Sequence, residues 1–156
     1  MSTLVLYFSK YGHTQMVAEA VARVLESTLE VRLLSFDRIT VPELRGATLI
    51  VAGSPTHKMN MPNKVRPMID AWPKGVLSGT PVAAFDTSYK MNAVLSRFTA
   101  AKKLLRKLRK IGGKRILPPE TFLVMGREGP LFEGELERAG QWAAEILAQL
   151  GGSIST

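Results

Sequence analysis

The sequence contains no cysteine and only two histidines, His13 and His57. Without thiols the chain can form no disulfide, iron–sulfur cluster, thiolate nucleophile or cysteine-ligated metal site. Two histidines also argue against a histidine-rich metal centre. We therefore expect no metal site and no catalytic side chain, and any redox chemistry has to come from a bound cofactor.

The sequence also lacks a long apolar run. The pure apolar stretch near the start, Leu4–Phe8, has five residues, whereas a membrane span needs about 18. No basic segment precedes it, and it is too short for a secretory signal. We expect a cytoplasmic protein in which residues 1–150 form one domain and residues 151–156 a frayed tail, since 156 residues that are 46% apolar are enough for one core.

Acidic residues are missing from one segment that carries the whole charge excess. The net charge is +8, and the segment Lys102–Arg115 contains eight basic residues and no acid, so that the rest of the chain is balanced. A solvated helix face is the simplest interpretation, and docking of an acidic partner is the next. Nucleic-acid binding is disfavoured because no aromatic residue is interleaved with the cations.

Short apolar runs followed by turn residues indicate buried parallel strands at residues 4–8, 47–52 and 82–85. Weaker strands are expected at residues 30–34 and 121–125. Between the strands, apolar residues recur at helical spacing. The periodic residues are Val17, Val21, Val24 and Leu25; Val65, Met68, Ile69 and Trp72; Val94, Phe98, Ala101, Leu104, Leu105, Leu108 and Ile111; and Leu136, Ala139, Ala143, Ile146 and Leu150.

The alternation of five strands with helices predicts an α/β fold, a doubly wound five-stranded parallel sheet with helices on both faces. Gly112 and Gly113 are expected to end the fourth of these helices. The connection from Phe36 to Gly46 is short and contains Pro42, which leaves its helix open.

A candidate phosphate loop joins the first strand to the first helix. The segment is Phe8-Ser9-Lys10-Tyr11-Gly12-His13-Thr14. Here a doubly wound fold offers unpaired N–H groups and the positive end of a helix dipole. Ser9 and Thr14 add hydroxyl groups, and Gly12 lets the backbone approach an anion closely. The P-loop and dinucleotide glycine motifs are absent from the sequence, and Ser9 and Gly53 stand where a response-regulator receiver needs acids.

This loop resembles the flavodoxin fingerprint: an apolar strand ending in an aromatic residue, then Ser/Thr-x-Ser/Thr-Gly-x-Thr and an amphipathic helix. Residues 4–14 follow that pattern, except that Tyr11 replaces a small hydroxyl residue. The segment Gly53–Pro62 resembles the Ser-Pro-Thr loop in the flavodoxin modules of flavo-diiron proteins. The segment Asp86–Asn92 is similar to the second flavin loop of the family. An uninterrupted fifth strand would match the short-chain type.

The resemblance implies one FMN at the carboxyl edge of the sheet, near the topological switch point. Tyr89 either stacks on the flavin ring or is a surface tyrosine, and Thr56 either bonds the ring edge or caps a proline turn. We expect Asp86 to form a turn, His13 to be exposed and Trp72 to be core. The candidate FMN-binding residues are Ser9, Lys10, Tyr11, Gly12, His13, Thr14, Pro55, Thr56, His57, Lys58, Met59, Asp86, Thr87, Ser88, Tyr89 and Lys90, with His57 and Met59 the candidates for the inner ring face.

The function implied by the resemblance is electron transfer by FMN, whose three redox states the protein would bias. Familiar flavodoxins are acidic and this chain is basic, so an acidic redox partner docking near Lys102–Arg115 is the corresponding expectation. The alternative is a small FMN-dependent enzyme, such as a quinone reductase or a flavodoxin-like protoporphyrinogen oxidase. A scaffold that has lost its flavin is the third possibility.

Overall fold

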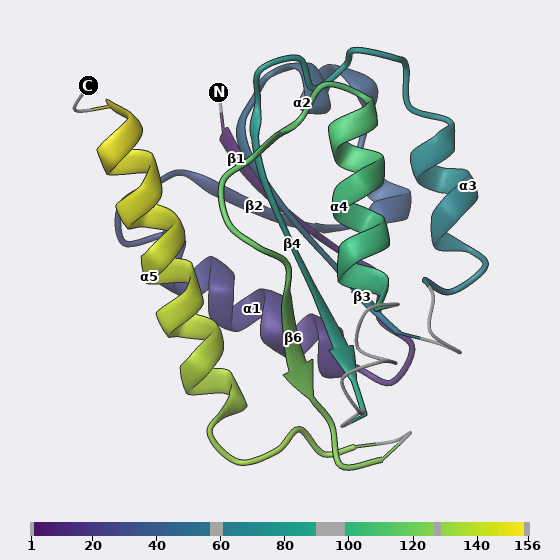
Figure 1. Cartoon of the computed structure of the whole chain (residues 1–156), viewed down its shortest axis with the longest axis vertical. Helices are drawn as coiled ribbons and strands as arrows, with labels where there is room; N and C mark the ends of the chain where they lie inside the picture. Colours follow the sequence, from purple (N-terminus) through teal and green to yellow (C-terminus); the bar gives the residue numbers. More distant parts are fainter. Residues whose placement is uncertain (1, 57–60, 90–98, 127–128, 155–156) are drawn as a thin grey trace.

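The fold is a parallel sheet between two helical layers, seen in a computed structural model that describes residues 2–56, 61–89, 99–126 and 129–154. The strands are β1 (Ser2–Tyr7), β2 (Val31–Ser35), β3 (Ala47–Pro55), β4 (Pro81–Ser88), β5 (Lys114–Arg115) and β6 (Glu120–Leu123). Their order is β2-β1-β3-β4-β5, with β6 also pairing with β4, and every pair is parallel (Figure 1). The predicted doubly wound parallel sheet is confirmed.

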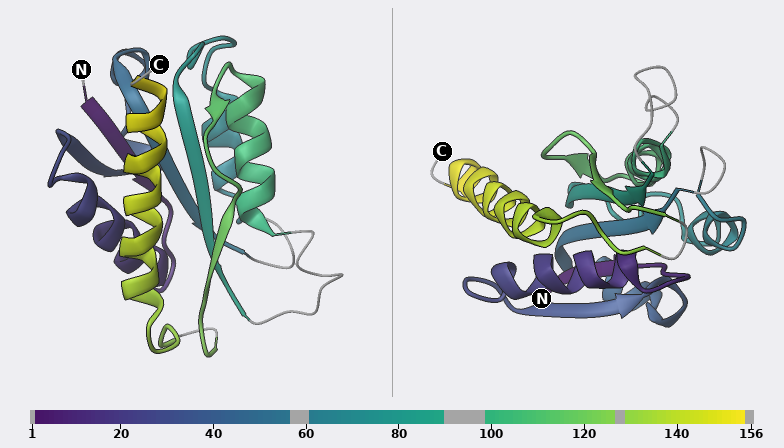
Figure 2. Two further views of the ribbon diagram at one scale, coloured as in Figure 1. Left: turned by 60° about the vertical axis from the view of Figure 1, so that its left-hand side comes forward. Right: turned by 90° about the horizontal axis from the view of Figure 1, so that it is seen from below.

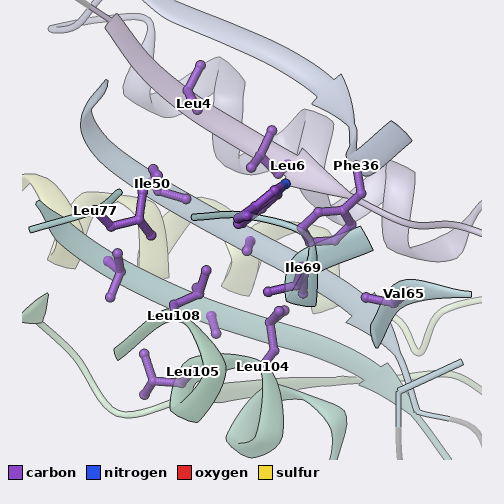
Figure 3. Packing of buried hydrophobic residues seen from close by; sticks show 14 of the residues in the cluster. Leu4, Leu6, Phe36, Ile50, Val65, Ile69, Leu77, Leu104, Leu105 and Leu108 are labelled. Atoms are coloured by element: carbon purple, nitrogen blue, oxygen red, sulfur yellow. The ribbon is translucent and has the colours of Figure 1, made fainter. Parts of the chain in front are cut away.

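Helices cover both faces of this sheet (Figure 2). The chain forms α1 (His13–Leu25), a 3-10 turn η1 (Phe36–Arg38), α2 (Val41–Arg45), α3 (Val65–Asp70), α4 (Ala100–Lys110) and α5 (Glu135–Ile154). Helices α1 and α5 pack on one face, and α2, α3 and α4 contribute to the core of the other. Successive strand residues point to opposite faces, so Leu4 and Leu6 pack with α4 (Figure 3), while Val5 packs with α1 and α5. Both layers are apolar, which explains the unalternated strands of the sequence.

The fifth position of the sheet is divided between β5 and β6. The strand predicted at residues 121–125 corresponds to β6, which runs from Glu120 to Leu123, whereas the two-residue strand β5 was not predicted. Arg115 pairs with Val82 and Glu120 pairs with Phe85. Four residues therefore face a stretch of β4 that has two, and two of the four are Pro118 and Pro119. Proline has no N–H to give to the ladder, so the chain bulges between β5 and β6. Strand β6 starts at Glu120, one residue before the predicted start.

The connection that the sequence left open contains the short helix α2. Thr40 is its N-cap and forms a capping box with Glu43: the Glu43 N–H donates to Thr40 Oγ1, and the Thr40 N–H donates to Glu43 Oε1 (both 3.4 Å). Pro42 lies in the first turn, where its missing N–H costs no helical hydrogen bond. The same proline that obscured the helix is therefore compatible with its start.

Several predicted helix boundaries differ from the structure. Helix α3 ends at Asp70, so Trp72 follows it, although Trp72 is buried in the core beside the Phe36 ring as predicted. Helix α5 continues past Leu150 to Ile154. Val94 and Phe98 lie outside the described residues. Gly112, at φ 109°, follows the C-cap of α4, in agreement with its expected role. No helix in the described part of the chain is long and apolar enough to cross a membrane.

Candidate functional site

Three segments of the predicted site leave the sheet at one edge. The register pairs Tyr7 of β1 with Gly53 of β3, and Gly53 with Phe85 of β4. Strands β3 and β4 both run further than the apolar runs indicated, to Pro55 and Ser88. Asp86, Thr87 and Ser88 therefore belong to a strand, and the expectation that Asp86 forms a turn is wrong. Because β1, β3 and β4 are parallel neighbours, their carboxyl ends meet at this edge.

The loop before α1 has the features of an anion site. Ser9 Oγ accepts hydrogen bonds from the Gly12 N–H (3.0 Å) and the Gln15 N–H (3.4 Å). Gly12 is the N-cap of α1 at φ 93° and has no side chain of its own to cap the helix, so Ser9 satisfies the Gln15 N–H and leaves those of His13 and Thr14 uncapped. The first turn carries no acidic residue, and no atom would lie within 4 Å of a Cβ at Gly12. The uncapped N–H groups and the open space beside Gly12 fit the phosphate of FMN.

Two residues of this loop have partners that the sequence did not indicate. Thr14 is buried, and its hydroxyl lies 2.8 Å from the Thr87 hydroxyl, which ties the start of α1 to the end of β4. His13 is half-buried rather than exposed, because its imidazole packs against Gly129. A Cβ at Gly129 would lie 1.9 Å from His13 Nε2. The turn after β6 therefore contacts the phosphate loop.

The end of β3 is joined to α4 through a buried carboxylate. Thr56 Oγ1 donates to Asp86 Oδ2 (3.0 Å) and accepts from the Ala100 N–H (2.9 Å), while the Ala101 N–H also donates to Asp86 Oδ2 (2.9 Å). The N-cap residue Thr99 supplies no side-chain cap, so Thr56 and Asp86 satisfy the first N–H groups of α4. Burial raises the pKa of Asp86, against the lowering effect of the Ala101 N–H.

Two exposed aromatic side chains stand at the same edge. Tyr11 is 39% exposed and Tyr89 is 46% exposed, and the ammonium of Lys10 lies 5.4 Å from the centre of the Tyr11 ring. Because its ring is exposed at this edge, Tyr89 is available for stacking. His57, Lys58, Met59 and Lys90 lie outside the described residues.

The turn after β6 adds residues that the sequence analysis did not select. Met125 is 62% exposed and Phe132 is 38% exposed, on either side of a bridge between Val124 and Leu131. Strand β6 pairs with β4 as far as Leu123 and Ser88, so the turn that follows β6 lies next to the end of β4 at the site. This position follows from the topology and not from a sequence motif. Their apolar character alone is ordinary for a chain that is 46% apolar.

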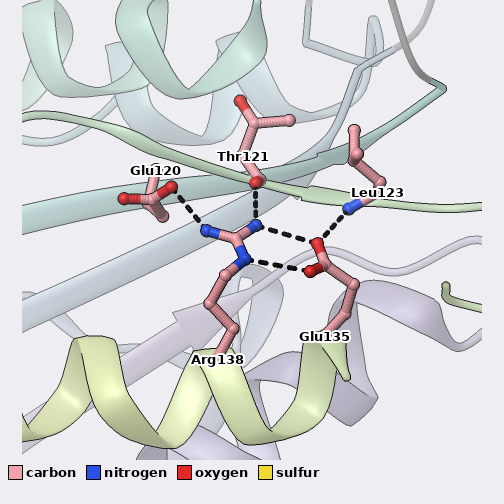
Figure 4. A network of polar contacts seen from close by, with 5 residues as sticks. All are labelled: Glu120, Thr121, Leu123, Glu135 and Arg138. Atoms are coloured by element: carbon pink, nitrogen blue, oxygen red, sulfur yellow. Dashed lines mark hydrogen bonds and ion pairs between the residues drawn. The ribbon is translucent and has the colours of Figure 1, made fainter. Parts of the chain in front are cut away.

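An ion-pair cluster anchors β6 to α5 (Figure 4). Arg138 donates to Glu120 (2.6 Å), to both carboxylate oxygens of Glu135 (2.8 and 2.9 Å) and to the Thr121 carbonyl oxygen. Glu135 also accepts from the Leu123 N–H (2.7 Å). The hydrogen bonds from Arg138 are the largest influence on the pKa of Glu135 and lower it, against the raising effect of burial. The cluster fixes β6 against α5 on one side of the candidate site.

A family model described as a flavodoxin domain matches residues 4–125. The chain belongs to the flavodoxin family. Proteins of this family bind FMN, which confirms the predicted cofactor. The matched range includes the phosphate loop, the ends of β3 and β4, and the turn after β6 as far as Met125.

Solved structures agree with this assignment at the level of the fold. A flavodoxin from the domain Archaea superimposes with a TM-score of 0.78 at 24% identity, over 97% of this chain and 99% of that one. The rubredoxin:oxygen oxidoreductase of Desulfovibrio gigas superimposes with a TM-score of 0.71 at 16% identity, over 99% of this chain and 37% of that one. The similarity to this part of the oxidoreductase holds at the level of the fold.

The curated proteins that are similar to this chain in sequence carry the names of enzymes. An NAD(P)H dehydrogenase (quinone) of Geobacter sulfurreducens is 33% identical over 118 residues, which cover 56% of this chain and 58% of the relative. The chain thus spans little more than half the length of the curated relatives it matches.

Proposed function

We propose that this chain is a one-flavin electron carrier whose FMN lies across the carboxyl ends of β1, β3 and β4. The observation that carries the proposal is the α1 N-terminus, whose N-cap Gly12 has no capping side chain and lies in the left-handed region, and whose first turn has no acidic residue. Such a terminus binds the phosphate dianion without needing a cation. The bound flavin supplies the electron chemistry, which the side chains of a chain without cysteine cannot supply.

Some residues around this terminus would contact the cofactor, and others hold those contacting residues in place. We propose that Ser9 and the amides of residues 10, 11, 13 and 14 bind the phosphate, and that Tyr89 covers one face of the ring. Thr56 and Asp86 instead act as positioning residues, since their oxygens already hold the start of α4. Thr87 positions the phosphate loop through Thr14.

Flavin titration tests this assignment at one hydroxyl. Ser9 Oγ accepts hydrogen bonds from the Gly12 and Gln15 N–H groups, and its own proton remains available for a phosphate oxygen. A hydrogen bond to a charged group is worth about 1.5 to 3 kcal/mol, so Ser9→Ala should weaken FMN binding roughly ten- to a hundredfold. Riboflavin, which lacks the phosphate, should bind the variant and the wild type equally.

The control is Ser27→Ala, which removes an exposed serine at the far end of α1 and should leave both affinities unchanged. Equal losses of FMN and riboflavin affinity in Ser9→Ala would contradict the placement of the phosphate. A purified chain that shows no flavin absorption and takes up no FMN would contradict the proposed function itself.

A second candidate function is FMN-dependent quinone reduction. It is favoured by the relative named NAD(P)H dehydrogenase (quinone), which is 33% identical over 118 residues. Turnover of a quinone with a nicotinamide donor, without an added reductase, would establish the enzyme. The absence of turnover in a chain that still accepts electrons from a reductase would establish the carrier.

For the carrier, we propose a partner with an acidic surface that docks near Lys102–Arg115. The segment has eight basic residues and no acid, and complementary charge accelerates the encounter of two proteins.

A further inference from the structure

The outer flank of α4 forms one wall of a groove. Four exposed cations follow one another along this flank, Lys102, Arg106, Arg109 and Lys110, at the spacing that aligns residues on one face of a helix. The opposite wall comes from other elements, Arg115 of β5 and Pro119 of the segment that leads to β6. The groove measures about 540 Å³ and is open to solvent, which is room for a few side chains rather than for one ion.

These cations are not used within the described fold. The four salt bridges between described residues join Arg32 to Glu43, Lys107 to Asp70, and Arg138 to Glu120 and Glu135. Lys107 of the same helix is half-buried and turned to an acid of α3, whereas the five groove cations are exposed and form none of these pairs. Helix α4 therefore carries Lys107, which pairs with an acid within the fold, and four of the groove cations, which form no salt bridge with a described residue.

We propose that this groove binds an extended acidic segment of the electron-transfer partner. The proposal deepens the proposed function and rests on it. Three of the five cations are arginines, whose planar guanidinium groups bind carboxylates in a bidentate manner. Leu105 and Pro119 give the groove an apolar part on which the stems of Glu or Asp side chains can pack.

Other polyanions fit the groove less well. A flat bilayer would not reach into a hollow bounded by two walls. No aromatic residue lines the groove, so bases of a single strand would find no stacking surface. A chain of carboxylates needs only the spaced cations and the apolar part.

The groove begins close to the candidate flavin site. Lys102 directly follows Ala100 and Ala101, whose N–H groups bond Thr56 and Asp86 at the carboxyl edge. From Lys102 to Lys110 the helix rises about 12 Å, so an extended segment of about four residues would lie along it. The bound segment of the partner would therefore begin about one helical turn from the carboxyl edge of the sheet, where the flavin is proposed to lie.

Fluorescence anisotropy with a labelled octaglutamate peptide tests the groove in the FMN-loaded chain. The double variant Arg106→Glu, Arg109→Glu should raise the dissociation constant at least about tenfold at low salt, because two attractive contacts become repulsive. The matched control is Arg45→Glu, Lys74→Glu, which changes the net charge equally at two exposed residues outside the groove and should lose much less affinity. Circular dichroism verifies that both variants are folded.

Equal losses in the two variants would overturn the proposal, because the peptide would then respond to net charge alone. Tighter binding of an oligothymidylate, or of vesicles containing phosphatidylglycerol, with a larger loss in the groove variant, would also overturn it by assigning another occupant. If a chain that takes up no FMN still binds the peptide through the groove, the proposed function is contradicted. The inference that the groove binds an acidic segment is then still supported.

Discussion

At the scale of single residues, Gly53 shows how closely the strands approach at the candidate site. It pairs with Phe85 of β4, and a Cβ at position 53 would lie 2.0 Å from the tip of the Phe85 ring. Gly53→Ala should therefore lower the free energy of unfolding by about 1 to 3 kcal/mol, because the ring has to shift within a packed core. Urea denaturation measures the loss.

Gly46→Ala is the control for that substitution. The nearest atom to a Cβ at Gly46 is a backbone oxygen at 3.6 Å, an ordinary contact, so the stability should hardly change. Wild-type stability in Gly53→Ala would show that the Phe85 ring is not held where the structure places it.

The position of the phosphate loop beside the ends of β3 and β4 was predictable, but the contacts between them were not. Parallel strands bring their carboxyl ends together, so the sequence alone placed Ser9, Thr56 and Tyr89 at one edge. It did not indicate that Asp86 is buried, because the donors that hold the carboxylate, Thr56 and the Ala101 N–H, come from 30 and 15 residues away along the chain. The contact of His13 with Gly129 is equally remote in sequence.

At the scale of elements, the Arg138 cluster links β6 to α5 through charge. The pKa of Glu135 lies below its ordinary value of 4.5, chiefly through Arg138. A lowered pKa stabilises the fold above that ordinary value, and this stabilisation is lost as the pH falls through the folded-state pKa. Thermal unfolding between pH 7 and pH 3 should show a smaller acid-induced loss of stability in Glu135→Gln than in the wild type.

Glu137→Gln is the matched control, in the same helical turn but exposed; it should follow the wild-type pH dependence. Glu135→Gln should also be less stable than the wild type at pH 7, since Arg138 loses one of its two carboxylate partners. An unchanged pH dependence in Glu135→Gln would mean that the cluster does not form in solution.

The elements themselves were largely predictable, since apolar runs and helical periodicity each reflect burial along one segment. The errors lie where local chemistry competes with burial. Strands β3 and β4 continue through Ser54, Pro55, Asp86 and Thr87 because their neighbours pair with them, although these residues are typical of turns. The short strand β5 was missed because its two residues, Lys114 and Arg115, are charged and exposed.

At the scale of the whole molecule, the net charge of +8 should act on the cofactor. The second electron leaves FMN with a negative charge, which a positive surround stabilises. Salt screens this field, with a Debye length of about 8 Å at physiological ionic strength. The midpoint potential for the second electron should therefore fall as salt is added, by a few tens of millivolts, on the scale of about 59 mV per tenfold change for one electron.

Spectroelectrochemistry over a series of salt concentrations measures this shift. The groove variant Arg106→Glu, Arg109→Glu, which lowers the net charge from +8 to +4, should show a smaller fall, because the charge excess of the chain lies in the segment Lys102–Arg115. A potential that rises with salt would show that negative groups dominate around the flavin.

The pair Pro118 and Pro119 also bears on how copies of the molecule behave toward one another. The β5–β6 position is a lateral edge of the sheet, and an edge with regularly spaced N–H groups can recruit a strand from another copy. Here the edge is broken into segments of two and four residues, and the break contains two residues without an N–H. A neighbouring strand would find no continuous ladder to extend, so the edge is protected against strand-by-strand aggregation.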